Sequence, residues 1–342
     1  MNPIAGIFLI MLGSIGAASF YVPFKKVKSW AWESYWISQG LFAWIIIPWI
    51  FAFIFLPGGE LIPVIKESPA QAKLMAMFFG ILWGFGGLTF GLSIRYLGIA
   101  LGQSIALGLC AAFGTLIPPI VSGENLFSTT GGILTVTGVA ITVAGIAIIG
   151  YAGSLKSAEM SEEEKKAAIK EFALRKGIMI AIFAGLMSAC FNFGFEAGKP
   201  IEKIALAHGT NPLFQKNPSI IFILLGGFIT NLIYCGYLNF RNKTYKDYFS
   251  VPGNVLFNNL FFTFLAGFLW FLQFHFFGMG SSKLPAGMAV FGWSILMALN
   301  IAISNIWGII LNEWKGASKK TITILVAGIA ILILSTFIVK LA

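Results

Sequence analysis

Two carboxylic acids near the ends of long apolar segments could bind and release protons. Glu33 stands at the start of one such segment, and Glu196 stands near the end of another. An ionisable side chain inside a membrane costs at least about 2.5 kcal/mol, so it is rarely kept there without a use. We therefore predict Glu33 and Glu196 as proton-coupling residues. Two plainer readings stay open: Glu33 could sit at a helix N-terminus, where the dipole favours an acid, and Glu196 could pair with Lys199 or Lys203.

Amide, indole and phenol side chains recur at helical spacing in the same segments. Such groups suit a small hydroxyl-bearing ligand, because a buried hydroxyl without a partner costs about 1 to 3 kcal/mol and aromatic rings offer flat apolar surface. The ligand-binding residues predicted by this pattern are Tyr21, Lys25, Asn192, Asn259, Trp270, Gln273, Trp293 and Asn300. An ordinary hydrogen bond between packed helices is the alternative role for each amide.

Other side chains that could do chemistry fit plainer roles. His275 is expected to face lipid or the outer interface, and Trp30, Trp32, Trp36 and Trp49 fit an interfacial belt. The three cysteines lie inside apolar segments without metal-ligand spacing, which favours packing. No Walker motif or Ser/His/Asp order stands in a loop long enough to house it. We expect no metal, no cofactor other than a coupling proton, and no enzymatic activity.

The composition requires membrane-spanning helices to position these residues. The chain has 342 residues, of which 58% are hydrophobic and 11% charged, and its mean hydropathy is +0.86. A soluble domain has roughly 25% charged residues, and about 20 apolar residues cross a bilayer as a helix. We predict an all-α integral membrane protein with ten transmembrane helices. The predicted ranges are 3–22, 34–56, 74–94, 97–121, 131–150, 178–198, 219–240, 255–280, 285–311 and 321–339.

The positive charges predict how the chain is inserted. The net charge of +10 comes from short loops between apolar runs, a pattern that argues against a nucleic-acid partner. If the loop after the first helix is cytoplasmic, most of the 23 basic residues face inside, so both termini are predicted outside. The stretch 153–176, which mixes acidic and basic residues, is predicted to be a cytoplasmic linker between two halves, 1–152 and 177–342.

A repeated hexapeptide supports a duplication. Val-Ala-Gly-Ile-Ala-Ile occurs at 143–148 and again at 326–331, in the last helix of each half. Because each half has five helices, an odd number, the second half enters the membrane upside down. We therefore predict a 5+5 inverted repeat, with the substrate site near mid-membrane between the halves.

Short motifs distributed along the chain resemble one family. The run Phe-Tyr-Val-Pro-Phe-Lys-Lys-Val-Lys at 20–28 precedes Glu33, and Leu-Trp-Gly at 82–84, Ile-Arg-Tyr-Leu-Gly at 94–98 and Lys-Pro at 199–200 follow in order. Together they resemble the L-rhamnose/proton symporter family, within the ten-helix drug/metabolite transporter superfamily. The resemblance implies proton-coupled import of L-rhamnose or a related sugar across a bacterial inner membrane by alternating access.

Two other readings stay open. The stretch 286–291 reads Ala-Gly-Met-Ala-Val-Phe, which is less polar than the family pattern and favours an exporter of drugs or metabolites from the same superfamily. An intramembrane enzyme or a receptor-like subunit would need a catalytic constellation or a large soluble region. The sequence offers neither feature.

Overall fold

The structure is a computed structural model that describes residues 2–159, 174–285, 288–312 and 314–341. Within these ranges the regular structure is entirely helical. Among the described residues, ten stretches are long and apolar enough to cross a membrane. These findings confirm the predicted fold class, an all-α membrane protein with ten transmembrane helices.

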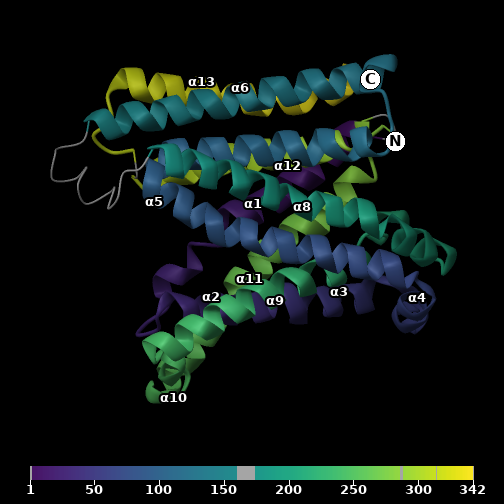
Figure 1. The fold of residues 1–342 in the computed structure, drawn as a ribbon, viewed down its shortest axis with the longest axis horizontal. Helices are drawn as coiled ribbons and strands as arrows, with labels where there is room; N and C mark the ends of the chain where they lie inside the picture. The colour runs from purple at the N-terminus through teal and green to yellow at the C-terminus, as the bar shows by residue number, and fades with distance from the viewer. Residues whose placement is uncertain (1, 160–173, 286–287, 313, 342) are drawn as a thin grey trace. The chain divides into compact units, whose positions relative to one another are not determined.

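Figure 1 shows the helices, coloured from purple at the N-terminus to yellow at the C-terminus. The α-helices are α1 (Pro3–Ser19), α2 (Trp32–Gly40), α3 (Ile47–Phe55), α4 (Leu61–Glu67), α5 (Ala70–Val121), α6 (Thr130–Glu159), α8 (Leu174–Ala207), α9 (Asn217–Asn242), α10 (Asp247–Ser250), α11 (Gly253–Ser281), α12 (Phe291–Ile310) and α13 (Lys319–Thr336). The shorter elements are η1 (Pro23–Lys26), η2 (Leu41–Ile46), η3 (Pro57–Gly59), η4 (Leu126–Ser128), η5 (Pro212–Phe214), η6 (Thr244–Lys246) and η8 (Phe337–Leu341).

Helix α5, of 52 residues, carries two of the predicted spans. These spans are Ala70–Ser93 and Ser104–Val121. Gly86 lies against Ser188 of α8, Leu97 lies against Gly177, and the Gly114 carbonyl accepts from Asn192. The first span therefore runs backward along α8 and the second runs forward, so the chain reverses direction between them. The predicted division between the third and fourth spans is confirmed.

The second span changes its helical geometry in the middle. The π-helix η2 joins α2 to α3 and carries Trp44. Pro48, in the first turn of α3, has no amide hydrogen to donate to the preceding turn, which favours a wider turn at this place. The backbone of Gly40 lies directly against the Trp44 ring, where a larger residue would clash.

The helices form two compact units, and each unit draws on both halves of the sequence. Unit 1 comprises 1–11, 85–192 and 280–342, and unit 2 comprises 12–84 and 193–279. The predicted division into 1–152 and 177–342 as two repeats stays a prediction. Most of the predicted linker 153–176 lies outside the described residues, although α6 extends into it as far as Glu159.

In unit 1 the two copies of the hexapeptide lie on neighbouring helices, because α6 packs along α13 (Figure 1). A methyl group added at Gly145 would lie 2.7 Å from Leu332, and one added at Gly328 would lie 2.7 Å from Ile149. The hydroxyls of Thr142 and Ser335 are 3.0 Å apart. Each step forward along α6 thus meets a step backward along α13, so the fifth and tenth spans are antiparallel. Each glycine lets the other helix approach closely.

In unit 2, helix α9 packs along α2, η2 and α3. Glycines also bring α9 against the first part of α5, where Gly80 and Gly226 leave room for the opposing backbone. The Thr230 hydroxyl donates to the Ile81 carbonyl at 3.0 Å. This close approach places the Trp83 ring on the backbone of Gly227. The packing of unit 2 therefore gathers aromatic rings from several helices.

Candidate functional site

The predicted site residues are divided between the two units. Unit 1 holds three of them, and unit 2 holds the rest. Those in unit 1 are Asn192, Trp293 and Asn300, and those in unit 2 are Tyr21, Lys25, Glu33, Glu196, Asn259, Trp270 and Gln273.

Two of the three predicted residues in unit 1 bind the backbone of α5. The Asn192 amide donates to the Gly114 carbonyl at 2.8 Å, and the Trp293 indole donates to the Cys110 carbonyl at 3.2 Å. Phe191 stacks on Trp293 with ring centroids 6.1 Å apart. Asn300 lies half-buried further along α12. These hydrogen bonds are of the kind that joins packed helices in membrane proteins, which was the alternative role for the amides.

Three predicted residues of unit 2 lie near the loop after α1. Tyr21 and Lys25 are exposed. Asn259 is fully buried, and its amide both accepts from the Lys28 backbone N–H at 2.9 Å and donates to the Lys28 carbonyl at 2.8 Å. Asn259 therefore fastens this loop to α11, and its side chain already has a donor and an acceptor as partners.

Glu33 is buried at the start of α2 and is held by neutral donors. Its Oε1 accepts from Asn242 at 2.9 Å and from Thr244 at 2.8 Å. Next to it, the Ser34 hydroxyl donates to Asp247 at 2.8 Å. These contacts attach α2 to the connection between α9 and α11. Glu33 thus has a structural task in this geometry, and its part in proton coupling stays a prediction.

Glu196 forms an ion pair with Lys199 one turn later on α8, as the plainer reading of the sequence expected. Its side chain is 26% exposed and that of Lys199 is 55% exposed. An ion pair with this exposure contributes little to stability, because water screens the charges. The role of Glu196 in proton coupling also stays a prediction.

Three indoles from different helices pack together in unit 2. Trp44 from η2, Trp83 from α5 and Trp270 from α11 have ring centroids 5.6 to 5.8 Å apart. We call them the indole cluster. Trp36, one further indole on α2, lies 6.1 Å from Trp44, and its N–H donates to the Asn231 side chain at 3.0 Å. Trp270 is thus the one predicted residue that belongs to the cluster.

Two polar groups beside the indole cluster are buried without partners. Gln39 is completely buried, and neither its amide nitrogen nor its amide oxygen has a hydrogen-bond partner among the described residues. The indole N–H of Trp44 is buried and unpartnered in the same way. The backbone carbonyl of Gln39 lies against Gly267 of α11, three residues before Trp270 of the indole cluster.

The arrangement is suited to a small molecule with hydroxyl groups and apolar faces. An unpaired buried polar group costs about 1 to 3 kcal/mol, so a bound molecule that pairs with these three atoms would gain that free energy. Gln39 can both donate and accept, Trp44 can donate, and the flat indole faces can pack on apolar ring surfaces. Gln273, also buried, donates to the Trp270 carbonyl at 3.0 Å and helps to fix this part of α11.

Sequence reasoning missed Gln39, Trp44 and Trp83. Gln39 is an amide within an apolar predicted span, which is the signal that could have selected it. Trp83 stands in a motif that resembles the family, but the motif does not tell what the ring contacts. Trp36 is predicted to belong to an interfacial belt. Its ring stacks on Trp32 on one side and contacts the edge of Trp44, a member of the indole cluster, on the other.

The expectation for His275 is wrong. The side chain is buried, 4% exposed, and does not face lipid or water. Its Nδ1 lies 3.2 Å from the Asn217 side-chain oxygen, and its ring packs against Phe51, Phe55 and Phe214. Phe271, one turn before His275, packs on Phe51 of α3, so this face of α11 meets α3.

A second histidine makes an ionic cluster at the loops of unit 2. His208 Nδ1 lies 2.6 Å from Glu60, and its Nε2 lies 2.9 Å from Glu67. The hydrogen bonds to Glu67 and Glu60 raise the pKa of the His208 imidazole, because both carboxylates favour the charged ring. The cluster connects the loop before α9 with the α4 segment.

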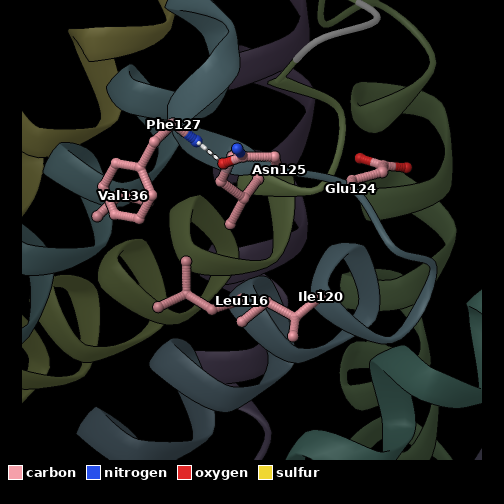
Figure 2. Close-up of a pocket in the computed structure, with 7 residues that line it drawn as sticks. Leu116, Ile120, Glu124, Asn125, Phe127 and Val136 are labelled. Carbon is pink, nitrogen blue, oxygen red and sulfur yellow. Dashed lines mark hydrogen bonds between the residues drawn. The ribbon is translucent and has the colours of Figure 1, made fainter.

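Unit 1 contains a small hollow of about 250 Å³ near η4. Figure 2 shows Leu116 and Ile120 of α5 across from the loop that carries Glu124, Asn125 and Phe127. The lining is mostly apolar, and the Asn125 side chain accepts from the Phe127 backbone N–H at 3.0 Å. Its polar lining groups are the Glu124 carboxylate and the Asn125 amide, and it has no indole ring among its lining residues. Among the described residues, no group of three or more His, Cys, Asp or Glu side chains is placed to hold a metal ion.

Comparison with known proteins agrees with the resemblance seen in the motifs. The profile of the L-rhamnose-proton symport protein family matches residues 1–342. Proteins named L-rhamnose-proton symporter from Yersinia pestis (strain Pestoides F) and Yersinia pseudotuberculosis serotype O:1b (strain IP 31758) are each 37% identical over 343 residues, which is 99% of this chain and 97% of each relative. This multi-pass membrane chain therefore belongs to the L-rhamnose-proton symport protein family.

Proposed function

We propose that this protein is a secondary active transporter that imports L-rhamnose, or a closely related sugar, together with protons. The single observation that carries the choice of site is the set of unpartnered polar atoms of Gln39 and Trp44 beside the indole cluster. The Yersinia relatives bear names that state the same substrate and coupling ion. We expect the sugar to leave the protein chemically unchanged.

In this proposal each part of the site has a distinct task. Gln39 and the Trp44 N–H bind sugar hydroxyls, and the faces of Trp83 and Trp270 pack on the apolar side of the ring. A deoxyhexose has a methyl group in place of one hydroxyl, and an indole face accommodates a methyl group without leaving a polar group unpaired. The site thus favours a sugar that is polar on one side and apolar on the other.

The cellular setting is part of the same proposal. We place the protein in a bacterial inner membrane with both termini outside, because the basic residues gather in the loops predicted to be cytoplasmic. Membership of the drug/metabolite transporter superfamily and a 5+5 inverted repeat are supported by the antiparallel packing of α6 and α13. Inverted repeats are a common basis for alternating access.

An exporter of drugs or metabolites is the less favoured alternative. Its support was the apolar stretch 286–291, of which residues 286–287 lie outside the described residues. Met288 and Phe291 are completely buried, and the Phe291 ring lies against the backbone of Gly138. Packing inside unit 1 accounts for these apolar side chains without an apolar substrate.

The test is transport by purified protein in liposomes. We expect labelled L-rhamnose to accumulate inside when the outside is more acidic, and unlabelled L-rhamnose to make a weakly buffered outside solution more alkaline. A panel of L-fucose, L-mannose, D-glucose and L-rhamnose, each at the same concentration, defines the substrate by competition. Accumulation that does not depend on the proton gradient, or efflux of a drug without any sugar uptake, would contradict the proposal.

A further inference from the structure

A buried ion pair joins the C-terminal part of α8 to the start of α9 in unit 2. The Lys216 ammonium lies 3.1 Å from Glu202 Oε1 and 3.3 Å from Oε2. The Glu202 side chain is 9% exposed and the Lys216 side chain is 14% exposed. Sequence reasoning did not single out either residue. This pair differs from the exposed Glu196 and Lys199 on the same helix, because it is largely removed from water.

Aromatic and backbone groups close around the pair. The Lys216 ammonium lies 4.9 Å from the centre of the Phe195 ring, which packs on Phe277 of α11. The stem of Lys216 also lies against Gly278, where an added methyl group would be 3.2 Å from its Cβ. Three helices, α8, α9 and α11, therefore meet at these two charges.

A buried pair of this kind has two alternative states. In a low-dielectric site, removing the cation from a carboxylate leaves a charge whose burial is strongly unfavourable. A proton can take the place of the cation, because it neutralises the carboxylate directly. The contact between α8 and α9 can thus be held by Coulomb attraction or released when Glu202 becomes a neutral acid.

The other buried acid and imidazole side chains of the described residues lack this property. Among the described residues, Glu33 and His275 are the other buried acid and imidazole groups. Glu33 accepts from the neutral groups of Asn242 and Thr244, and His275 contacts the neutral amide of Asn217. Neither has a cationic partner that a proton could replace.

We propose that Glu202 is the residue that binds the transported proton, and that Lys216 is its competing partner. The inference rests on the proposed function, since it names the coupling site of that transport. One proton from the outer solution binds a Glu202 carboxylate oxygen, while Lys216 keeps its own protons and loses its ionic contact. On the inner side the same proton leaves the carboxyl group, and the ion pair forms again.

The other charged groups near the Glu202–Lys216 ion pair are engaged elsewhere or exposed. The other charged and titratable groups near this end of the surrounding elements are Glu196, Lys199 and Lys203 on α8, His208 just after it, His275 on α11, and Glu60, Lys66 and Glu67 at the α4 segment. Glu196 pairs with Lys199, and His208 contacts both carboxylates of the α4 segment. Lys203 is exposed. The ion pair between Glu202 and Lys216 is therefore separate from the other ionic contacts nearby.

The experiment separates sugar exchange from proton-driven accumulation in proteoliposomes. Counterflow of labelled L-rhamnose against unlabelled sugar needs no net proton movement, whereas accumulation under a gradient of one pH unit can reach about tenfold for one coupled proton. We expect Glu202→Gln to keep counterflow within about threefold of the native rate and to lose accumulation and sugar-induced alkalinisation. Lys216→Met should show the same split. Glu124→Gln and Lys203→Met, at exposed positions, should behave like the native chain.

Glu202→Gln alone leaves a buried lysine without its partner, which can disturb the fold and abolish both counterflow and accumulation. The double variant Glu202→Gln with Lys216→Met removes both charges and tests the proposal in that case. Counterflow without accumulation in Glu202→Gln, or in the double variant with Lys216→Met, supports the proposal. Accumulation by Glu202→Gln at the native level overturns it, as does a double variant that either accumulates sugar or lacks counterflow. If the native chain accumulates no L-rhamnose, the proposed function fails first, and this inference fails with it.

Discussion

Replacing Gln39 by Met should stabilise the free protein and weaken sugar binding. Methionine has nearly the same length and volume as glutamine, so the packing around this completely buried position is kept. The substitution removes an amide whose nitrogen and oxygen both lack partners among the described residues. If the sugar supplies those partners, stability without sugar and affinity for sugar must change in opposite directions.

The structure sets the size of both effects. Burying an unpaired polar group costs about 1 to 3 kcal/mol, so Gln39→Met should gain about that much in the free energy of unfolding without sugar. At about 2 °C per kcal/mol, the melting midpoint rises by about 2 to 6 °C. Losing two hydrogen bonds to the ligand, each worth about 0.5 to 1.5 kcal/mol, weakens sugar binding by about 5 to 150-fold.

The assay is thermal unfolding of detergent-solubilised protein with increasing L-rhamnose, which reports midpoint and affinity from the same samples. Gln71→Met is the matched control, because Gln71 is exposed at the start of α5. This control should change the unfolding free energy by less than about 0.5 kcal/mol and leave sugar binding as it is. A Gln39→Met protein that melts earlier than the native chain and binds L-rhamnose equally well would refute the reasoning, since the amide would then be bonded within the protein.

Two further predictions follow from contacts outside the site. Gly145→Ala places a methyl group 2.7 Å from Leu332 and should destabilise the protein by about 1 to 3 kcal/mol, whereas Gly236→Ala, with no atom within 4 Å, should not; thermal unfolding compares the two. Because both carboxylate partners raise the pKa of His208, their contribution to stability is complete at pH values below the ordinary histidine pKa of about 6.5 and is lost as the pH rises through the folded-state pKa. The difference in melting midpoint between the native chain and His208→Gln should therefore be larger at pH 5.5 than at pH 9, and an equal difference at both values would contradict this role.

The fold was more predictable from the sequence than the site. Ten spans follow from the lengths of the apolar runs alone, because the bilayer fixes how many apolar residues a helix needs. The division near Arg95, predicted from one charge between two apolar runs, agrees with the two spans Ala70–Ser93 and Ser104–Val121 within α5.

The residues of the site depend on partners that a single helix does not reveal. Asn259 and Gln39 are both amides in apolar spans, and helical spacing selected only Asn259. The structure binds Asn259 to the backbone of Lys28, far away in the sequence, and leaves Gln39 unpartnered among the described residues. Which amide is occupied depends on the packing of other helices. The same holds for Glu202, whose importance appears only when Lys216 is found beside it.

The contact between α6 and α13 has the form of an isologous subunit interface contained in one chain. The glycine of each hexapeptide meets the residue four positions beyond the glycine of the other copy, which is the reciprocity that a two-fold axis imposes on identical partners. In a symmetric dimer, one substitution in the gene changes such an interface in two places. Once both copies lie in one gene, Gly145 and Gly328 can be replaced independently, so the two ends of this contact are free to diverge while the contact itself persists.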